Sequence, residues 1–154
     1  MGKRMILPFN LLILKVFHAQ KNRVRPAMAE IGLSPGQPKL LTFLALHGEC
    51  LQKELAAACD IEPATISKLL NLLEENGLVA RSDRAGDRRA VAVDLTEKGR
   101  RLYENEIRVR IEKINSDALA GFSEAERHEF ECYLRRMYRN LTGIPLGQPE
   151  RAGR

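Results

Sequence analysis

The segment Pro63–Arg81, with the sequence PATISKLLNLLEENGLVAR, decides the fold of this chain. Its apolar residues recur at offsets of three and four as far as Leu73, which predicts an amphipathic helix that begins at the proline. Asn76-Gly77 is a typical helix end, because glycine readily adopts the left-handed backbone that closes many helices. β-Prone residues follow the glycine, so the segment predicts a helix and then a strand.

A shorter helix, about Gln52–Cys59, is expected just before this one. The linking segment Asp60–Pro63 predicts a tight turn, because aspartate tolerates a left-handed backbone. After the second helix, Leu78–Arg81 and Ala90–Val93 are β-prone runs on either side of the charged loop Ser82–Arg89. Two helices joined by a tight turn and followed by a hairpin are the layout of a winged helix-turn-helix, whose second helix enters the DNA major groove.

Helical patterns also precede this region. The apolar spacing in Ile6–Ile31 predicts a long helix that Gly32 closes, and Pro26 is expected to kink or interrupt it. The segment Ser34–Gln37 predicts the start of the next helix, with serine as its cap and Pro35 at its first position. The chain therefore places two helices ahead of the predicted helix-turn-helix.

Two further helices follow the hairpin. Thr96 is expected to cap a helix that runs to about Leu119, and Ser123 with Glu126 forms a capping box for the last one. The predicted fold class is mainly α with a small β-hairpin wing: a winged helix-turn-helix whose N- and C-terminal helices form a dimerisation domain. The expected parts, together one domain of about residues 5–142, are a dimerisation helix (1–33), the winged helix-turn-helix (34–95, with the helix-turn-helix at about 52–76 and the wing at about 78–95), C-terminal dimerisation helices (96–142) and a loose tail (143–154).

The polar face of the second helix is a candidate for DNA recognition. Ile66, Leu69, Leu70 and Leu73 share one face and are expected to pack inward. The remaining positions carry small or polar side chains that allow close approach and hydrogen bonds to bases or phosphates. These candidates are Ala64, Thr65, Ser67, Lys68 and Asn71. For an isolated helix, a plain solvated face would be the better interpretation, and the adjoining hairpin tips the balance towards DNA.

The hairpin tip is rich in arginine. Arg84, Arg88 and Arg89 stand where a wing would reach the DNA backbone or a narrow, electronegative minor groove. Asp87 does not suit contact with phosphate, so we expect it to orient a neighbouring arginine through a paired hydrogen bond. The tip therefore predicts a second DNA contact beside the recognition helix.

These motifs together resemble the MarR family of regulators. The resemblance covers nearly the whole chain, and the ordered series that ends in Asp-Arg-Arg and Leu-Thr-Glu-Lys-Gly is its most specific part. Pro26 and Pro38 depart from the commoner pattern. The residues that carry the resemblance are Gln37–Leu41, Leu55-Ala56, Ile66–Leu70, Leu73–Arg81, Asp87–Ala90 and Leu95–Gly99.

The resemblance implies a homodimer that binds a pseudo-palindromic operator in double-stranded DNA. By position, Thr65, Ser67, Lys68 and Asn71 match the reading surface, Arg88 and Arg89 the wing, and Asp87 its stabilising acid. It also implies a repressor that a small, often aromatic or phenolic, molecule releases from DNA. The apolar residues of Ile6–Phe17 agree with a dimer, because they exceed what one small winged helix could cover.

Composition and charge agree with a DNA-binding protein without requiring one. The 154 residues carry a net charge of +5 and have a pI near 9.3. This mild positive charge fits binding to nucleic acid, binding to an anionic membrane or a charged surface that contacts only water. No apolar run is long enough to cross a bilayer, and no cleavage site follows the apolar start. The sequence therefore predicts a cytoplasmic protein with no membrane partner.

Enzymatic, thiol-responsive and metal-responsive functions have less support. The sequence has no phosphate-binding glycine loop, paired His-Glu metal motif or nucleophile elbow, so we expect no enzyme, no cofactor and no metal. Cys59 is interpreted as a small buried residue, while Cys50 and Cys132 leave a redox response open. His47 and Cys50 form a near pair of metal-ligating types, which alone is too few ligands for a metal site. A winged-helix protein-interaction module without an operator remains the main alternative.

Overall fold

The computed structural model describes residues 4–84 and 87–147, and of residues 87–89 it describes the backbone alone. Contacts divide the chain into two compact units, Met1–Asn115 and Ser116–Arg154. The predicted fold class is confirmed: the chain is mainly helical with one small antiparallel sheet. In chain order the elements are α1 (Phe9–Ala29), α2 (Gln37–His47), β1 (Cys50–Leu51), α3 (Gln52–Ala58), α4 (Pro63–Glu75), β2 (Val79–Arg84), β3 (Asp87–Leu95), α5 (Glu97–Leu102), the π-helical segment η1 (Tyr103–Ile107), α6 (Arg108–Ala118) and α7 (Glu124–Thr142).

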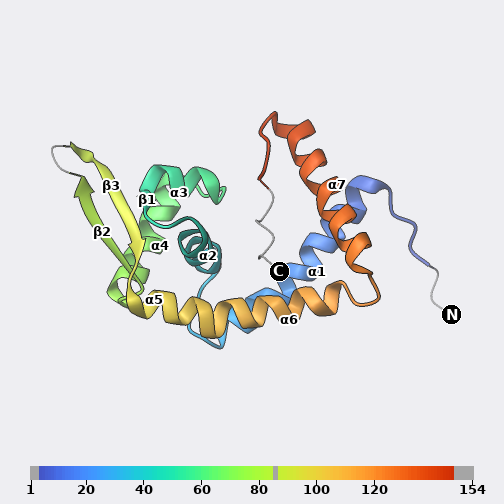
Figure 1. Cartoon of the computed structure of the whole chain (residues 1–154), viewed down its shortest axis with the longest axis horizontal. Coiled ribbons are helices and arrows are strands. Elements are labelled where there is room, and N and C mark those ends of the chain that lie inside the picture. Colours follow the sequence, from blue (N-terminus) through green and yellow to red (C-terminus); the bar gives the residue numbers. More distant parts are fainter. Residues whose placement is uncertain (1–3, 85–86, 148–154) are drawn as a thin grey trace. The chain divides into compact units, whose positions relative to one another are not determined.

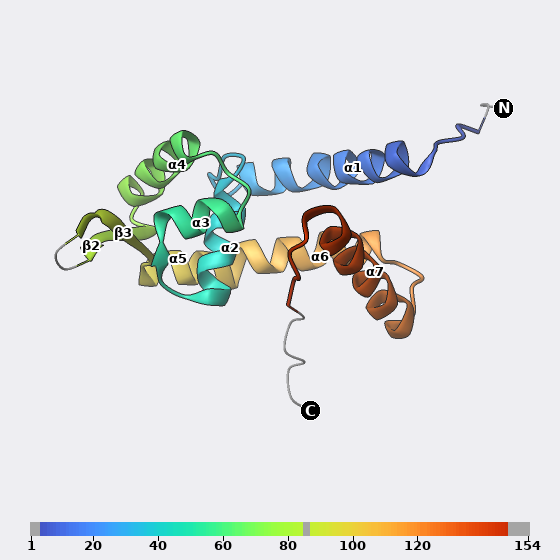
Figure 2. The same cartoon turned by 90° about the horizontal axis from the view of Figure 1, so that it is seen from above.

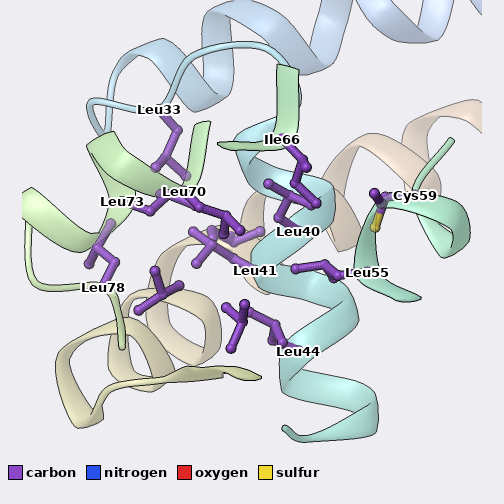
Figure 3. Packing of buried hydrophobic residues seen from close by; sticks show 14 of the residues in the cluster. Leu33, Leu40, Leu41, Leu44, Leu55, Cys59, Ile66, Leu70, Leu73 and Leu78 are labelled. Atoms are coloured by element: carbon purple, nitrogen blue, oxygen red, sulfur yellow. The ribbon is translucent and has the colours of Figure 1, made fainter. Parts of the chain in front are cut away.

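The first unit is built around α2. Figure 1 shows α3 and α4 beside α2, with the β2–β3 hairpin projecting beyond them. Leucines of α2 meet the buried face of α4 and Leu55 of α3 in one cluster (Figure 3). Burial of each such leucine stabilises the fold by about 2 kcal/mol. The fully buried residues at this contact are Leu40, Leu41, Leu44, Leu55, Ile66, Leu70 and Leu73.

The sheet has the strand order β1-β3-β2, and both pairings are antiparallel. The hairpin was predicted, but β1 was not, because two residues are too short to show strand periodicity. Cys50 of β1 pairs with Val93 of β3, and Arg81 of β2 pairs with the same valine from the other side. The base of the hairpin is therefore fixed to the segment that leads into α3.

The predicted turn and caps are confirmed in detail. Asp60 has a φ of 52°, the left-handed conformation expected between α3 and α4, and Pro63 is the first residue of α4. Ser123 and Glu126 form the expected capping box at the start of α7. Thr96 caps α5, because its Oγ1 accepts from the backbone N–H of Gly99. The sequence signals thus located the starts of α4, α5 and α7 correctly.

Three expectations need correction. The first helix begins at Phe9 and ends at Ala29, and it continues through Pro26, so the predicted interruption is wrong. Near the helix end the proline displaces few backbone bonds, and its carbonyl still accepts from the N–H of Glu30 at 3.1 Å. The second helix begins at Gln37, not at Ser34, because Gly36 has a φ of 91° and breaks the helical path. The long helix after Thr96 contains the π-helical segment η1, which no sequence pattern had indicated.

Figure 2 shows α1 as a long helix whose N-terminal half extends away from α2, α3 and α4. Of its residues only Met28 is buried, while Ile6, just ahead of the helix, and Phe9 are 94% and 69% exposed. Within the described residues, no helix is long and apolar enough to span a membrane.

One glycine closes the joint between the hairpin and α5. A Cβ on Gly99 would lie 2.0 Å from the carbonyl oxygen of Leu78. That oxygen cannot easily move away, because it accepts from the backbone N–H of Thr96 at 3.1 Å. The close approach of two backbone segments therefore requires glycine here.

We expect Gly99→Ala to lower the free energy of unfolding by about 3 kcal/mol, because the added methyl forces α5 away from Leu78. Urea denaturation measures the effect. Gly147→Ala is the matched control, because a Cβ there meets nothing within 4 Å. Equal stability of the two variants would contradict the described joint.

Candidate nucleic-acid interface

Helix α4 has one buried apolar side and one exposed polar side, as predicted. Ile66, Leu70 and Leu73 are buried against the core, and Leu69 is half-buried. Four of the five predicted reading residues, namely Ala64, Thr65, Lys68 and Asn71, are exposed, and Ser67 is half-buried. The structure therefore brings these five residues together on one helix, beside the hairpin (Figure 2).

The far end of this face is held by an arginine of the neighbouring strand. The Arg81 guanidinium donates from Nη2 to Asn71 Oδ1 at 2.5 Å and to Glu74 Oε1 at 3.1 Å. Its Nε and its backbone N–H both donate to Glu74 Oε2, at 3.4 and 3.0 Å. The side-chain hydrogen bond from Arg81 lowers the pKa of the Glu74 carboxyl from its ordinary value of 4.5.

This network was missed by the sequence analysis. Both Arg81 and Glu74 belong to the segment that carries the resemblance, but neither was a candidate for the DNA interface. Their separation of seven residues crosses a helix end and a turn, so helical spacing gives no signal for the contact. Asn71 was predicted correctly as a surface residue, but its oxygen is already occupied by Arg81.

The wing is an antiparallel hairpin of β2 and β3, as predicted. Arg84 is placed at its end, where Nη2 forms an ion pair with Glu49 Oε1 at 2.8 Å. In the structure this arginine therefore ties the wing to the residue before β1, a contact between side chains that are both about half exposed. The side chains of Asp87, Arg88 and Arg89 lie outside the described residues, so their predicted roles stay predictions.

A cavity of about 610 Å³ lies between α1 and α2 and reaches the end of α3. Apolar side chains form much of its wall, among them Phe17, Met28 and Phe43. Three cationic side chains, Lys21, Arg25 and Lys39, also line it. A cavity with apolar walls and a few charged groups suits a small amphipathic molecule.

The cysteines show no activated thiol among those with a resolved effect. Burial, followed by the charges of Glu54, Asp94 and Glu49, raises the pKa of the Cys50 thiol. Burial also raises the pKa of Cys59, whose Sγ lies 3.8 Å from the carbonyl oxygen of Lys39. A raised pKa reduces the thiolate that oxidants attack. In the described part of the chain, no three His, Cys, Asp or Glu side chains gather where a metal ion could bind.

Comparison with known proteins agrees with this geometry. The model of the MarR family matches residues 31–90, from just after α1 into β3. A putative transcriptional regulatory protein for the hcr operon of Thauera aromatica is 32% identical over 119 residues, which are 77% of this chain and 71% of that protein.

Solved structures extend the likeness to the whole fold. The transcriptional regulator PA3341 is 31% identical with a TM-score of 0.79, over 89% of this chain and all of that one. A putative MarR family regulator from Listeria monocytogenes, solved with a 26mer DNA, is 26% identical with a TM-score of 0.80, over 88% of this chain and 90% of that one. With a matching family model, a relative above 30% identity and the same fold throughout, this chain belongs to the MarR family of transcriptional regulators.

Proposed function

We propose that the chain is a cytoplasmic, non-enzymatic repressor that binds a pseudo-palindromic DNA operator as a homodimer and is released by a small molecule. The observation that carries the DNA assignment is the exposed polar face of α4 beside a hairpin wing. Small side chains at Ala64 and Thr65 allow the first turns of α4 to approach base edges, and Lys68 supplies a phosphate contact. The Listeria regulator that was solved with DNA has the same fold, which supports this use of α4.

The dimer is proposed from the exposed apolar residues of the N-terminal segment. In Phe9–Gln20 all residues but one are exposed, so half of α1 buries almost nothing within its own unit. This half carries exposed leucine, phenylalanine and valine side chains, and soluble monomers rarely leave such a surface uncovered. α7 in the second unit also exposes apolar side chains, including Phe130, Tyr133 and Leu134. We assign both surfaces to a second copy of the chain, which would space two recognition helices by about 34 Å.

An effector is proposed for the cavity beside α1. The walls join α1, which we assign to the dimer, to α2, which carries the core under α4. A molecule bound there would therefore favour one relation of the dimer helices to the reading head. The cationic groups of Lys21, Arg25 and Lys39 favour an aromatic carboxylate over a neutral compound.

A protein-interaction module without an operator is the main competing function. The two functions differ in how binding responds to salt. Each contact with a DNA phosphate releases a counterion, so the affinity for DNA falls as the salt concentration rises. A titration of the wild-type protein on DNA from its own upstream region, by fluorescence anisotropy at two salt concentrations with competitor DNA, tests the proposal. Specific, salt-sensitive binding of two chains per site is expected. Binding that ignores sequence would contradict it.

We expect the double change Arg88→Ala, Arg89→Ala to weaken operator binding about 100-fold, because two contacts to the minor groove or backbone are lost. The slope of log affinity against log salt should fall by about two. The matched control removes two other arginines from exposed ion pairs on the helix surface, Arg101→Ala with Arg108→Ala. Equal effects of the two double variants would show that only total charge matters.

We expect salicylate, a phenolic carboxylate, to weaken operator binding of the wild-type protein. Thr42→Trp should abolish this response, because the indole would fill part of the cavity that Thr42 lines. Its operator affinity without salicylate should stay within about twofold of wild type, since Thr42 lies on α2, away from the reading face. An unchanged salicylate response in Thr42→Trp would place the effector elsewhere.

A further inference from the structure

We propose that Arg81 is a positioning residue for base recognition: it fixes the side-chain amide of Asn71 so that the Nδ2 donors face the DNA. This inference rests on the proposed function and adds to it the reason for which the recognition helix would prefer certain bases. It also gives β2 a part in sequence recognition beyond the support of the wing.

The Arg81 guanidinium contacts Asn71 and Glu74 at once, and we call this arrangement of hydrogen bonds the Arg81 fork. Nη2 bridges Asn71 and Glu74, while Nε and the backbone N–H both reach Glu74. The Arg81 side chain is only 21% exposed, in contrast to the 42% of Glu74. A planar guanidinium with three such hydrogen bonds, next to a backbone N–H that donates to the same glutamate, has little freedom. Its position is therefore determined by the strand and the helix end together.

The fork determines which end of the Asn71 amide is available. Oδ1 points to Arg81 and accepts its N–H, so the amide cannot rotate by half a turn without setting two groups of donors against each other. Among the described residues, Nδ2 of Asn71 donates to no protein acceptor. Asn71 therefore presents donors outward, and these match acceptors on base edges, such as the N7 and O6 of guanine, N7 of adenine or O4 of thymine.

The network also links the reading face to the hairpin. Arg81 lies in β2 and pairs with Val93 of the central strand β3, whereas Asn71 and Glu74 lie on the last turns of α4. A phosphate contact by Arg81 would be a different role, in which charge alone is sufficient. The two roles make opposite predictions for Arg81→Lys, because lysine keeps the charge but cannot form the fork.

The test is a set of binding titrations on the operator and on a series of its single-base variants. Asn71→Ala identifies the base pair whose substitution ceases to matter when the amide is absent. We expect Arg81→Ala and Arg81→Lys each to lose discrimination at that same base pair by about tenfold, with discrimination elsewhere retained. In the double variant Asn71→Ala, Arg81→Lys no further loss at that base pair is expected, because both changes remove one contact.

Controls separate positioning from folding and from charge. Arg101→Ala removes one arginine from an exposed pair with Glu97 and should leave the base preferences unchanged. Urea denaturation establishes that each variant is folded at the assay temperature. In the absence of DNA, the carboxyl signal of Glu74, followed by NMR, should show its pKa rising towards the ordinary value in Arg81→Ala.

Several results would overturn the inference. Full discrimination in Arg81→Lys would assign Arg81 to phosphate contact, and a uniform loss at every base pair would assign it to stability alone. An Asn71→Ala variant that keeps every base preference would remove Asn71 as a reader. A wild-type protein without any sequence preference would contradict the proposed function itself, and the wild-type titration reveals this outcome before any variant is compared.

Discussion

The burial of Ile66, Leu70 and Leu73 against the leucines of α2 is the interaction on which the rest of the first unit depends (Figure 3). It determines the rotation of α4 about its own axis and therefore which side chains face outward. Since each of these three residues is at most 1% exposed, a different rotation would bring polar side chains into a closely packed core. The reading face is thus a consequence of packing on the opposite side of the same helix.

A second constraint acts where α4 ends. Gly77 and Leu78 turn the chain into β2, Thr96 donates its hydroxyl to the Gly77 carbonyl, and Gly99 lets α5 lie directly against Leu78. The Arg81 network lies just beyond this joint. The wing, the recognition helix α4 and the start of α5 are consequently joined by a small group of residues. A shift of one of these three elements would therefore move the other two.

Local sequence signals located several turns and helix starts correctly. Pro63, Asp60 and the Ser123–Glu126 box mark boundaries through backbone preferences that a few neighbouring residues determine. Two features that were missed, β1 and the Asn71–Arg81 bond, depend on contacts between separate segments. β1 exists because Cys50 meets Val93, and the Asn71–Arg81 bond exists because a strand returns beside the helix. A surface position such as Asn71 could be predicted, but the group it presents depends on a partner ten residues away.

The central claim, that the exposed face of α4 reads the major groove in two symmetric half-sites, is tested most directly by methylation interference on the operator. Methylation of guanine N7 blocks the major groove, and methylation of adenine N3 blocks the minor groove. The account predicts two clusters of N7 interference about one helical turn apart, roughly 34 Å between centres, with N3 interference on their flanks where the wings reach. Interference in a single cluster, or in the minor groove alone, would contradict it.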